Sequence, residues 1–355
     1  MKIIIFAGGH GTRLWPLSRK NSPKQFEKMF NGKSTLQLMV DRVKPVVGIE
    51  NVYISTGSAF KEIIESQLTE LPRENIIYEP AKRDLAAAVG LAFLTLKQKG
   101  VNEPVAILWS DHLVENLSEF QNALRTGEQL INENPNRFIF NGEIPRFANN
   151  NLGWISIGDT IENKNGFDVH SFEGWIYRPD VELCNQLFES KRAVWNTGYF
   201  VTSVDFVTGL YQQHMPEMYS QLQQVVSSPE LLDSIYPTIE SIHFDEAIVQ
   251  KSRPDQAVVL TFDIGWSDPG TLYALKEAIV ANKNDNYIHG KAVSLATSDS
   301  MIFNQQQNKL VATIGLDGFV VVNTEDAVFV CHKDNIREIT QLLKQIEAEG
   351  YSEYL

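Results

Sequence analysis

The sequence predicts an α/β protein whose larger part is a doubly wound, mostly parallel sheet and whose smaller, C-terminal part is rich in β-strands. Two observations predict the sheet: apolar, β-branched runs recur along the first half of the chain, and helical stretches lie between them. A third observation indicates the smaller part, because the runs shorten and turns follow closely after Asp285. We therefore expect two domains, residues 1–284 and 285–355.

The strands of the larger domain are expected where apolar residues run without interruption, because strands of a parallel sheet are buried on both faces. These runs are Lys2–Phe6, Val52–Thr56, Val105–Trp109 and Phe138–Asn141. Apolar residues at helical spacing predict helices at Ser34–Val43, Asp84–Leu96 and Ser118–Ile131. The last helix begins at Ser118 with Gln121 three residues later, which fits a capping box. The alternation of strands and helices favours parallel pairing through helical crossovers.

After Asn149 the strand-like runs become shorter and polar turns separate them. They are Trp154–Ile157, Trp175–Tyr177 and Tyr199–Thr202. We interpret this half of the domain as an extension of the sheet that carries substrate specificity.

The C-terminal domain is expected to consist of short strands and a closing helix at Asn335–Glu349. The strand-like runs are Lys291–Leu295, Leu310–Ile314, Phe319–Asn323 and Val328–Cys331. Its turns are similar to the coils of a short left-handed β-helix, but no regular hexapeptide period is visible. A short β-helix and a small β-sheet cap are therefore both open at this point.

The composition argues against several classes of function. The 355 residues carry a formal net charge of −13, which argues against nucleic acid or an anionic membrane as a partner. The two cysteines, Cys184 and Cys331, lie far apart, so we expect neither a disulfide framework nor a structural zinc site. No apolar run is long enough for a signal-peptide core or a membrane span, and we expect a cytoplasmic protein.

The first strand runs into a loop of closely spaced glycines that is followed by basic residues. Gly8, Gly9 and Gly11 allow the backbone N–H groups to approach a phosphate, and Arg13 and Lys24 supply positive charge. This pattern predicts a site for a phosphate compound.

Single residues exclude two common phosphate-binding motifs. The third glycine of a dinucleotide fingerprint falls at Leu14, and the upstream glycine of a P-loop falls at Glu27. The predicted loop therefore belongs to another class of phosphate site.

The segment GGHGTRLWPLSRKNSPKQF, residues 8–26, resembles the GGxGTRLWPxSRxxxPKQF signature of sugar-nucleotide pyrophosphorylases, in the mannose-1-phosphate guanylyltransferase group. Later segments are similar, in order, to the family's EPxxRNTAPA, ADH, GYGYI, FVEKP, WNSGMF, SIDYAVM and DAGWSDVG motifs. They are Glu79–Ala88, Ser110–His112, Gly153–Ile155, Trp175–Pro179, Trp195–Phe200, Ser241–Val249 and Asp263–Gly270. The resemblance implies a Rossmann-like nucleotidyltransferase fold. It also implies transfer of GMP from GTP to a sugar 1-phosphate, with mannose 1-phosphate the first expectation, giving GDP-mannose and pyrophosphate.

The resemblance also assigns residues to the site. The nucleotide-binding residues are Gly8, Gly9, Gly11, Thr12, Arg13, Glu79, Arg83 and Ser110, and the sugar-phosphate-binding residues are Gly153, Tyr177, Arg178, Asn196 and Asp245. Asp111 and Asp268 are expected to hold Mg²⁺ or another divalent cation, which substrate phosphates also ligate. The expected catalytic residues are Arg13, Lys24 and Asp111, because in-line transfer needs charge stabilisation rather than a base.

The chain departs from the family in the segments expected to recognise the sugar. Tyr177 stands where FVEKP has glutamate, and Arg178 stands where it has lysine. Tyr177 removes an acceptor for sugar hydroxyls, whereas Arg178 keeps a charge that can bind phosphate. Arg83–Ala88 also lacks the Asn, Thr and Pro of RNTAPA. Two alternatives therefore stay open. One is a pyrophosphorylase for a different sugar 1-phosphate or nucleotide, and the other is a non-catalytic regulatory subunit that binds nucleotide sugars. By resemblance we also expect a homodimer.

Overall fold

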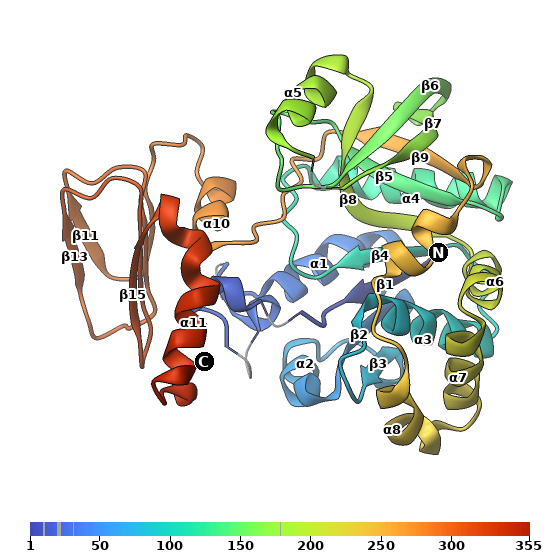
Figure 1. Cartoon of the computed structure of the whole chain (residues 1–355), viewed down its shortest axis with the longest axis horizontal. Coiled ribbons are helices and arrows are strands. Elements are labelled where there is room, and N and C mark those ends of the chain that lie inside the picture. Colours follow the sequence, from blue (N-terminus) through green and yellow to red (C-terminus); the bar gives the residue numbers. More distant parts are fainter. Residues whose placement is uncertain (10, 20–22, 31, 178) are drawn as a thin grey trace. The chain divides into compact units, whose positions relative to one another are not determined.

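The computed structural model describes residues 1–9, 11–19, 23–30, 32–177 and 179–355, and it divides into two compact units (Figure 1). The first unit contains Met1–Gly8, Gln37–Ser110 and Val114–Trp266, and the second contains Gly9–Leu36, Asp111–Leu113 and Ser267–Leu355. The domain division expected at residues 284 and 285 stays a prediction.

The first unit contains a nine-stranded mixed sheet with the order β3-β2-β1-β4-β8-β5-β9-β7-β6. Its strands are β1 (Lys2–Phe6), β2 (Val52–Gly57), β3 (Ile76–Glu79), β4 (Val105–Trp109), β5 (Phe138–Glu143), β6 (Trp154–Lys164), β7 (Phe167–Ile176), β8 (Ala193–Thr202) and β9 (Ala257–Phe262). Strands β1 to β4 pair in parallel, as predicted for β1, β2 and β4 from their unbroken apolar runs. Beyond β4 the sheet is mainly antiparallel, apart from the parallel pair β5 and β9.

The order in which successive strands are added to the sheet reverses at β1. The strands β2 and β3 continue on one side of β1 and β4 lies on the other, with Phe6 paired to Ser55 and to Trp109. Ligands of open α/β sheets bind beyond the carboxyl ends of strands at such a reversal. Within the first unit, Ala7, Gly8 and Ser110 follow these ends, and Ser110 donates its N–H to the Phe6 carbonyl at 3.1 Å.

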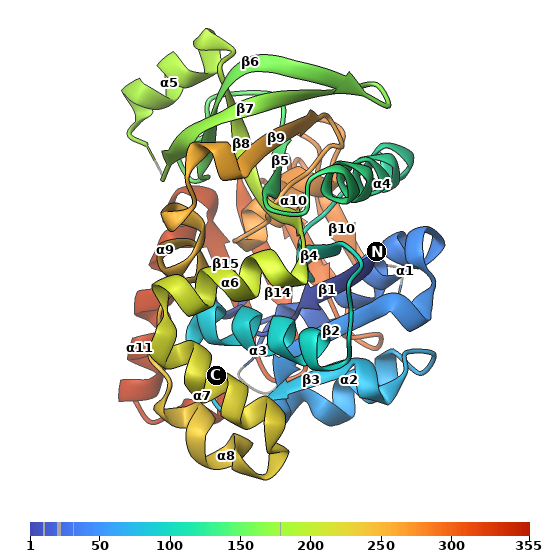
Figure 2. The same ribbon diagram turned by 90° about the vertical axis from the view of Figure 1, so that its right-hand side faces the viewer.

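Helices cover both faces of this sheet (Figures 1 and 2). The helices in this part of the chain are α1 (Thr35–Val47), α2 (Lys61–Gln67), α3 (Asp84–Gln98), α4 (Leu117–Glu133), α5 (Val181–Ser190), α6 (Val204–His214), α7 (Pro216–Ser227), α8 (Leu232–Ile235) and α9 (Phe244–Ala247). Successive residues of β8 show the two faces. Phe200 joins the cluster formed with α3 and α6, while Val201 lies against Gly127 of α4. The doubly wound α/β class is therefore confirmed.

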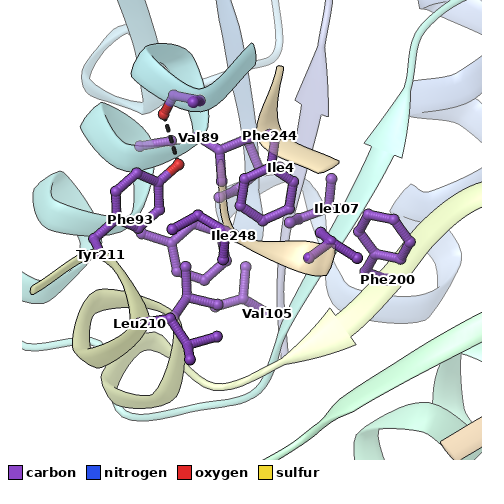
Figure 3. Close-up of a cluster of buried hydrophobic side chains, with 14 of the residues drawn as sticks. Ile4, Val89, Phe93, Val105, Ile107, Phe200, Leu210, Tyr211, Phe244 and Ile248 are labelled. Atoms are coloured by element: carbon purple, nitrogen blue, oxygen red, sulfur yellow. Dashed lines mark hydrogen bonds between the residues drawn. The ribbon is translucent and has the colours of Figure 1, made fainter. Parts of the chain in front are cut away.

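The main core lies between the parallel strands and α3, α6 and α9. Figure 3 shows Ile4 and Ile107 of the sheet packed with Phe93 of α3, all of them fully buried. A polar group at this contact, the Tyr211 hydroxyl, donates to the Ala86 carbonyl at 2.6 Å. Burial of each such apolar side chain contributes about 1.5–3 kcal/mol to stability, so this core holds the strand ends in place.

The second unit is built around short parallel strands. Its elements are α10 (Leu272–Ile279), β10 (Tyr287–His289), β11 (Ala292–Leu295), β12 (Met301–Asn304), β13 (Val311–Ile314), β14 (Phe319–Asn323), β15 (Val328–His332) and α11 (Ile339–Ala348). Strands β10, β12 and β14 pair in parallel, as do β11 and β13, so successive coils of chain stack on one another. Tyr287 pairs with Met301 and Met301 with Val320, so the repeat changes from coil to coil and no hexapeptide period arises.

The apolar core of the second unit includes the chain that follows the glycine loop. Leu14, Trp15 and Leu17 belong to one buried cluster with Met301 of β12 and Val320 of β14. The segment next to the predicted phosphate loop is therefore held by the core of this unit.

Several sequence predictions need correction. Helix α4 begins at Leu117 and is capped by Asn116, which accepts the Glu119 N–H at 3.2 Å, so the predicted capping box at Ser118 was wrong. The strands β3, β9, β10 and β12 were not predicted, since each is short or lies beside polar turns. Among the described residues, no helix has the length and apolar character needed to cross a membrane.

Candidate active site

In the glycine loop, two glycines have open space beside their backbone, and the carbonyl groups of two glycines accept hydrogen bonds from side chains. Among the described residues, a methyl group added at Gly8 or Gly9 would meet no atom within 4 Å apart from its chain neighbours. In the second unit, the Gln25 amide donates to the Gly9 carbonyl at 2.8 Å and the Ser18 hydroxyl donates to the Gly11 carbonyl at 2.5 Å. The loop therefore leaves room for a ligand at the glycine backbone, as a phosphate site requires.

Gly11 has a conformation that favours glycine. Its φ is +59°, in the left-handed region, and a Cβ there would lie 2.8 Å from Cγ of Lys24. The side chain of Thr12, like the whole of His10, lies outside the described part of the chain, so its predicted role in nucleotide binding stays a prediction. Gly11 thus allows close packing of the Lys24 stem against the loop.

Lys24 brings together the two aspartates predicted to bind metal. Its Nζ lies 2.6 Å from Oδ2 of Asp111 and 3.9 Å from Oδ1 of Asp268, all within the second unit. The segments that carry the aspartates are joined by Leu113 and Ser267, which exchange two backbone hydrogen bonds of 3.0 and 3.1 Å. Three residues far apart in the sequence therefore form one cluster of charges.

The charges of this cluster stabilise one another. Burial acts to raise the pKa of Asp111, but the Lys24 ammonium and His112 outweigh it and lower that pKa to about 2. Burial acts to lower the pKa of Lys24, but Asp111 and Asp268 outweigh it, so the pKa of this ammonium is raised. Asp111 and Lys24 are therefore both charged near neutral pH.

The aspartate pair fits a divalent cation. Both carboxylates already face one positive charge, the Lys24 ammonium, which serves as a stand-in for a bound cation. Among the described residues, no group of three or more His, Cys, Asp or Glu side chains could hold a metal ion. One or two carboxylates are what a protein commonly supplies to Mg²⁺ when substrate phosphates and water complete the shell.

Arg13 lies beside this cluster and is exposed. A Cβ built on Gly270 would be 3.4 Å from Nη1 of Arg13, and the guanidinium charge acts to lower the pKa of Lys24. Gly270 is two residues beyond Asp268, so the second unit brings Arg13 near Lys24 and near the segment that carries Asp268. An exposed guanidinium at this point can bind phosphate in a bidentate manner.

In the first unit, Glu79 and Arg83 lie near each other around Tyr236. The Tyr236 hydroxyl donates to Glu79 at 2.7 Å, and the Ser55 hydroxyl donates to the other carboxylate oxygen at 3.3 Å. Burial raises the pKa of Glu79, although these two donors oppose it. Arg83 acts to lower the pKa of Tyr236, and its buried Nε has no hydrogen-bond partner within the described residues. This polar cluster lies at the carboxyl ends of β2 and β3.

The residues predicted to bind the sugar phosphate occupy several places in the first unit. Asn196 donates its N–H to the Gly153 carbonyl at 2.9 Å, and its side chain accepts the Gly198 N–H at 2.8 Å, so Gly153 lies beside Asn196 where β6 and β8 pair. Tyr177 follows β7 and is 73% exposed, while Arg178 lies outside the described residues.

Asp245, also predicted to bind the sugar phosphate, lies in the first turn of α9, close to His243. The residue is exposed, but the protein atoms around its carboxyl group partly desolvate it and raise its pKa. The nearby His243 acts to lower that pKa. His243 lies 3.3 Å from Asp84, which has a φ of +60°. Asp245 is therefore part of a small polar group whose relation to the sugar stays a prediction.

Glu143 is a functional candidate that sequence reasoning missed. It is fully buried at the end of β5 and accepts the N–H groups of Trp266 at 2.9 Å and Ile264 at 3.1 Å. Its side chain also accepts from Arg146 at 2.8 Å. A charged residue two positions after the buried run Phe138–Asn141 was the available signal. Glu143 shapes the backbone just before Asp268 along the chain.

Comparisons with known proteins agree with these features. A model of the nucleotidyl transferase family matches residues 2–285, and a model of the MannoseP isomerase/GMP-like beta-helix domain matches residues 290–346. The second match favours the β-helix over the sheet cap.

Two relatives are similar over 99% of this chain. A putative mannose-1-phosphate guanylyltransferase of Vibrio cholerae is 30% identical, with 75% of its length covered, and a mannose-1-phosphate guanylyltransferase of Escherichia coli is 29% identical, with 76% covered. Among solved structures, a mannose-1-phosphate geranyltransferase from Thermus thermophilus is 26% identical with a TM-score of 0.87, over 98% of this chain and 99% of that chain. These similarities confirm the resemblance inferred from the motifs.

Proposed function

The chain belongs to the nucleotidyl transferase family, and we propose that it transfers GMP from GTP to mannose 1-phosphate, giving GDP-mannose and pyrophosphate. The observation that carries this proposal is the cluster of Lys24, Asp111 and Asp268 in the unit that also contains Gly9 and Gly11. The names of the relatives support mannose 1-phosphate and the guanylyl group as the substrates.

The proposed reaction needs positioning and charge stabilisation. An oxygen of the sugar phosphate attacks the α-phosphorus of GTP, the bond to the bridging oxygen breaks, and pyrophosphate leaves with that electron pair. Arg13 stabilises the charge of the leaving pyrophosphate, Lys24 holds phosphate, and the glycine amides accommodate the nucleotide phosphates. A phosphate nucleophile needs no general base at neutral pH, so His112 is assigned no proton transfer.

A divalent cation, Mg²⁺ in our proposal, would neutralise phosphate charge when it is bound by Asp111 and Asp268. The two carboxylates supply the protein's part of the shell, and Leu113 and Ser267 keep their segments together.

In the first unit, Glu79, Arg83 and Ser110 are proposed to contact the nucleotide. Gly153, Tyr177, Arg178, Asn196 and Asp245 are proposed to contact the sugar phosphate. The exposed phenol of Tyr177 favours a second candidate within the same chemistry, a different sugar 1-phosphate. The regulatory-subunit alternative is disfavoured, because Arg13, Lys24, Asp111 and Asp268 are all present.

The test is a product assay on the purified full chain with GTP, mannose 1-phosphate and Mg²⁺. We expect release of pyrophosphate that stops with a chelator and returns with added Mg²⁺. Asp111→Asn should reduce turnover by about 100-fold or more, whereas Asp233→Asn, at an exposed position in α8, should not. A panel of other nucleoside triphosphates and sugar 1-phosphates identifies the preferred pair. The proposal fails if no pair releases pyrophosphate.

We also propose that the protein is cytoplasmic and forms a homodimer. The first rests on the absence of an apolar run of membrane-spanning length in the sequence, and the second on the family resemblance.

A further inference from the structure

The ammonium group of Lys24 lies at the place where the two metal-binding aspartates converge. Its Nζ is 2.6 Å from Asp111 and 3.9 Å from Asp268, and only 13% of the side chain is exposed. The contact with Asp111 has the length of a charge-assisted hydrogen bond. Lys24 therefore neutralises carboxylate charge that a divalent cation would otherwise neutralise.

Packing holds the Lys24 stem in this position. The space that a Cβ of Gly11 would need is filled by Cβ, Cγ and Cδ of Lys24, at 3.0, 2.8 and 3.3 Å. Gln25, the next residue, is buried and donates to the Gly9 carbonyl. The start of the side chain is thus fixed against the glycine loop, and movement of the ammonium is confined to its outer bonds.

Two cations compete for the same carboxylates. A divalent cation bound by Asp111 and Asp268 repels the ammonium and takes the carboxylate charge that now stabilises it. A buried ammonium without an anionic partner is strongly disfavoured. The ion pair of Lys24 and Asp111 therefore opposes metal binding until another anion accepts the lysine.

We propose that Lys24 is an exchangeable internal cation. In the free enzyme its ammonium neutralises the pair Asp111 and Asp268. When a divalent cation binds, the ammonium leaves Asp111 and pairs with a substrate phosphate. This inference rests on the proposed function, which assigns the two aspartates to the metal. It makes metal binding weak without substrate phosphate and tighter with it, since each ligand removes the obstacle to the other.

The test measures Mn²⁺ binding to the full chain without nucleotide, by electron paramagnetic resonance of the free ion. Lys24→Met keeps the length of the side chain and removes the charge. We expect it to bind Mn²⁺ at least about tenfold more tightly than the wild type, since a hydrogen-bonded charge no longer has to be displaced. The matched control is Lys28→Met, which removes the same charge from an exposed lysine four residues further on and should bind like the wild type.

Two further results separate failure of this inference from failure of the proposed metal site. The double variant Asp111→Asn with Asp268→Asn should lose the site, and if it binds Mn²⁺ like the wild type, the metal assignment itself is wrong. If the double variant loses binding but Lys24→Met binds no more tightly than the wild type, the exchange proposal is overturned while the metal site stands.

A measurement on the unaltered protein avoids any effect of substitution on folding. Acetylation of lysines, followed by mass spectrometry, should modify Lys24 slowly in metal-free protein because its ammonium is paired with Asp111. Saturating Mn²⁺ should increase the acetylation of Lys24 severalfold and leave Lys28 unchanged. A rate at Lys24 that does not respond to Mn²⁺ would overturn the proposal.

Discussion

At the scale of single residues, Gly11 controls both the backbone of the loop and the position of Lys24. Gly11→Ala puts a side chain in the left-handed region and 2.8 Å from Lys24. We expect it to lower the free energy of unfolding by about 1–3 kcal/mol and to reduce turnover by about 100-fold, because Lys24 is displaced. Chemical denaturation and the pyrophosphate assay measure the two effects.

The matched control is Gly9→Ala, where a methyl group has no atom of the described chain within 4 Å apart from its neighbours in sequence. Its free energy of unfolding should change by no more than about 0.5 kcal/mol. Equal stability of the two variants would contradict the role given to Gly11.

Glu143 predicts a dependence of stability on pH. Burial raises its pKa from 4.5 to about 7, although the N–H groups of Ile264 and Trp266 oppose the rise. Through Glu143 the folded protein then binds more protons than the unfolded chain between these values, so the contribution of Glu143 to stability falls as the pH rises from 4.5 to 7 and is constant above 7.

Relative to Glu143→Gln, the wild type should lose on the order of 3 kcal/mol of unfolding free energy over this range, since each pH unit contributes about 1.4 kcal/mol. Denaturation at several pH values measures the slope. The control Glu182→Gln, at an exposed position, should show none of this difference. Parallel curves for wild type and Glu143→Gln would contradict the raised pKa.

At the scale of secondary structure elements, the start of α4 depends on one side chain. Asn116 accepts the Glu119 N–H at 3.2 Å, whereas Ser118 lies inside the helix and donates to Asn116. Asn116→Ala should therefore destabilise the protein by about 1 kcal/mol, and Ser118→Ala should cost much less. Thermal and chemical denaturation of the two variants decide between the caps, and a larger loss at Ser118 would restore the capping box predicted from the sequence.

At the scale of the whole molecule, the expected homodimer can be tested by mass. Light scattering should find two copies of the 40.1 kDa chain. The outer face of β11 and β13 is a place to look for the contact, because Val293, Leu295 and Ile314 are 59%, 65% and 74% exposed. Exposed apolar groups of this kind mark contact surfaces when they are contiguous. A monomer mass at micromolar concentration would contradict the prediction.

The sequence by itself determined the fold class and the family, and it predicted which residues form the site. Unbroken apolar runs predict β1, β2 and β4 because a strand buried on both faces needs apolar side chains at every position. The glycine spacing and the later motifs predict Gly11, Lys24, Asp111 and Asp268 as site residues, since a phosphate loop and a metal site need particular residue types at particular places. These properties depend on local composition, which the sequence carries directly.

Only the tertiary structure decided how those residues meet. Lys24, Asp111 and Asp268 are far apart along the chain, and no local pattern predicts that one ammonium lies between two carboxylates. Glu143 was missed for the same reason, because its carboxylate accepts hydrogen bonds from N–H groups that lie far away in the sequence. Distances between charges depend on how strands and turns pack, and packing is a property of the whole folded chain rather than of any segment of it.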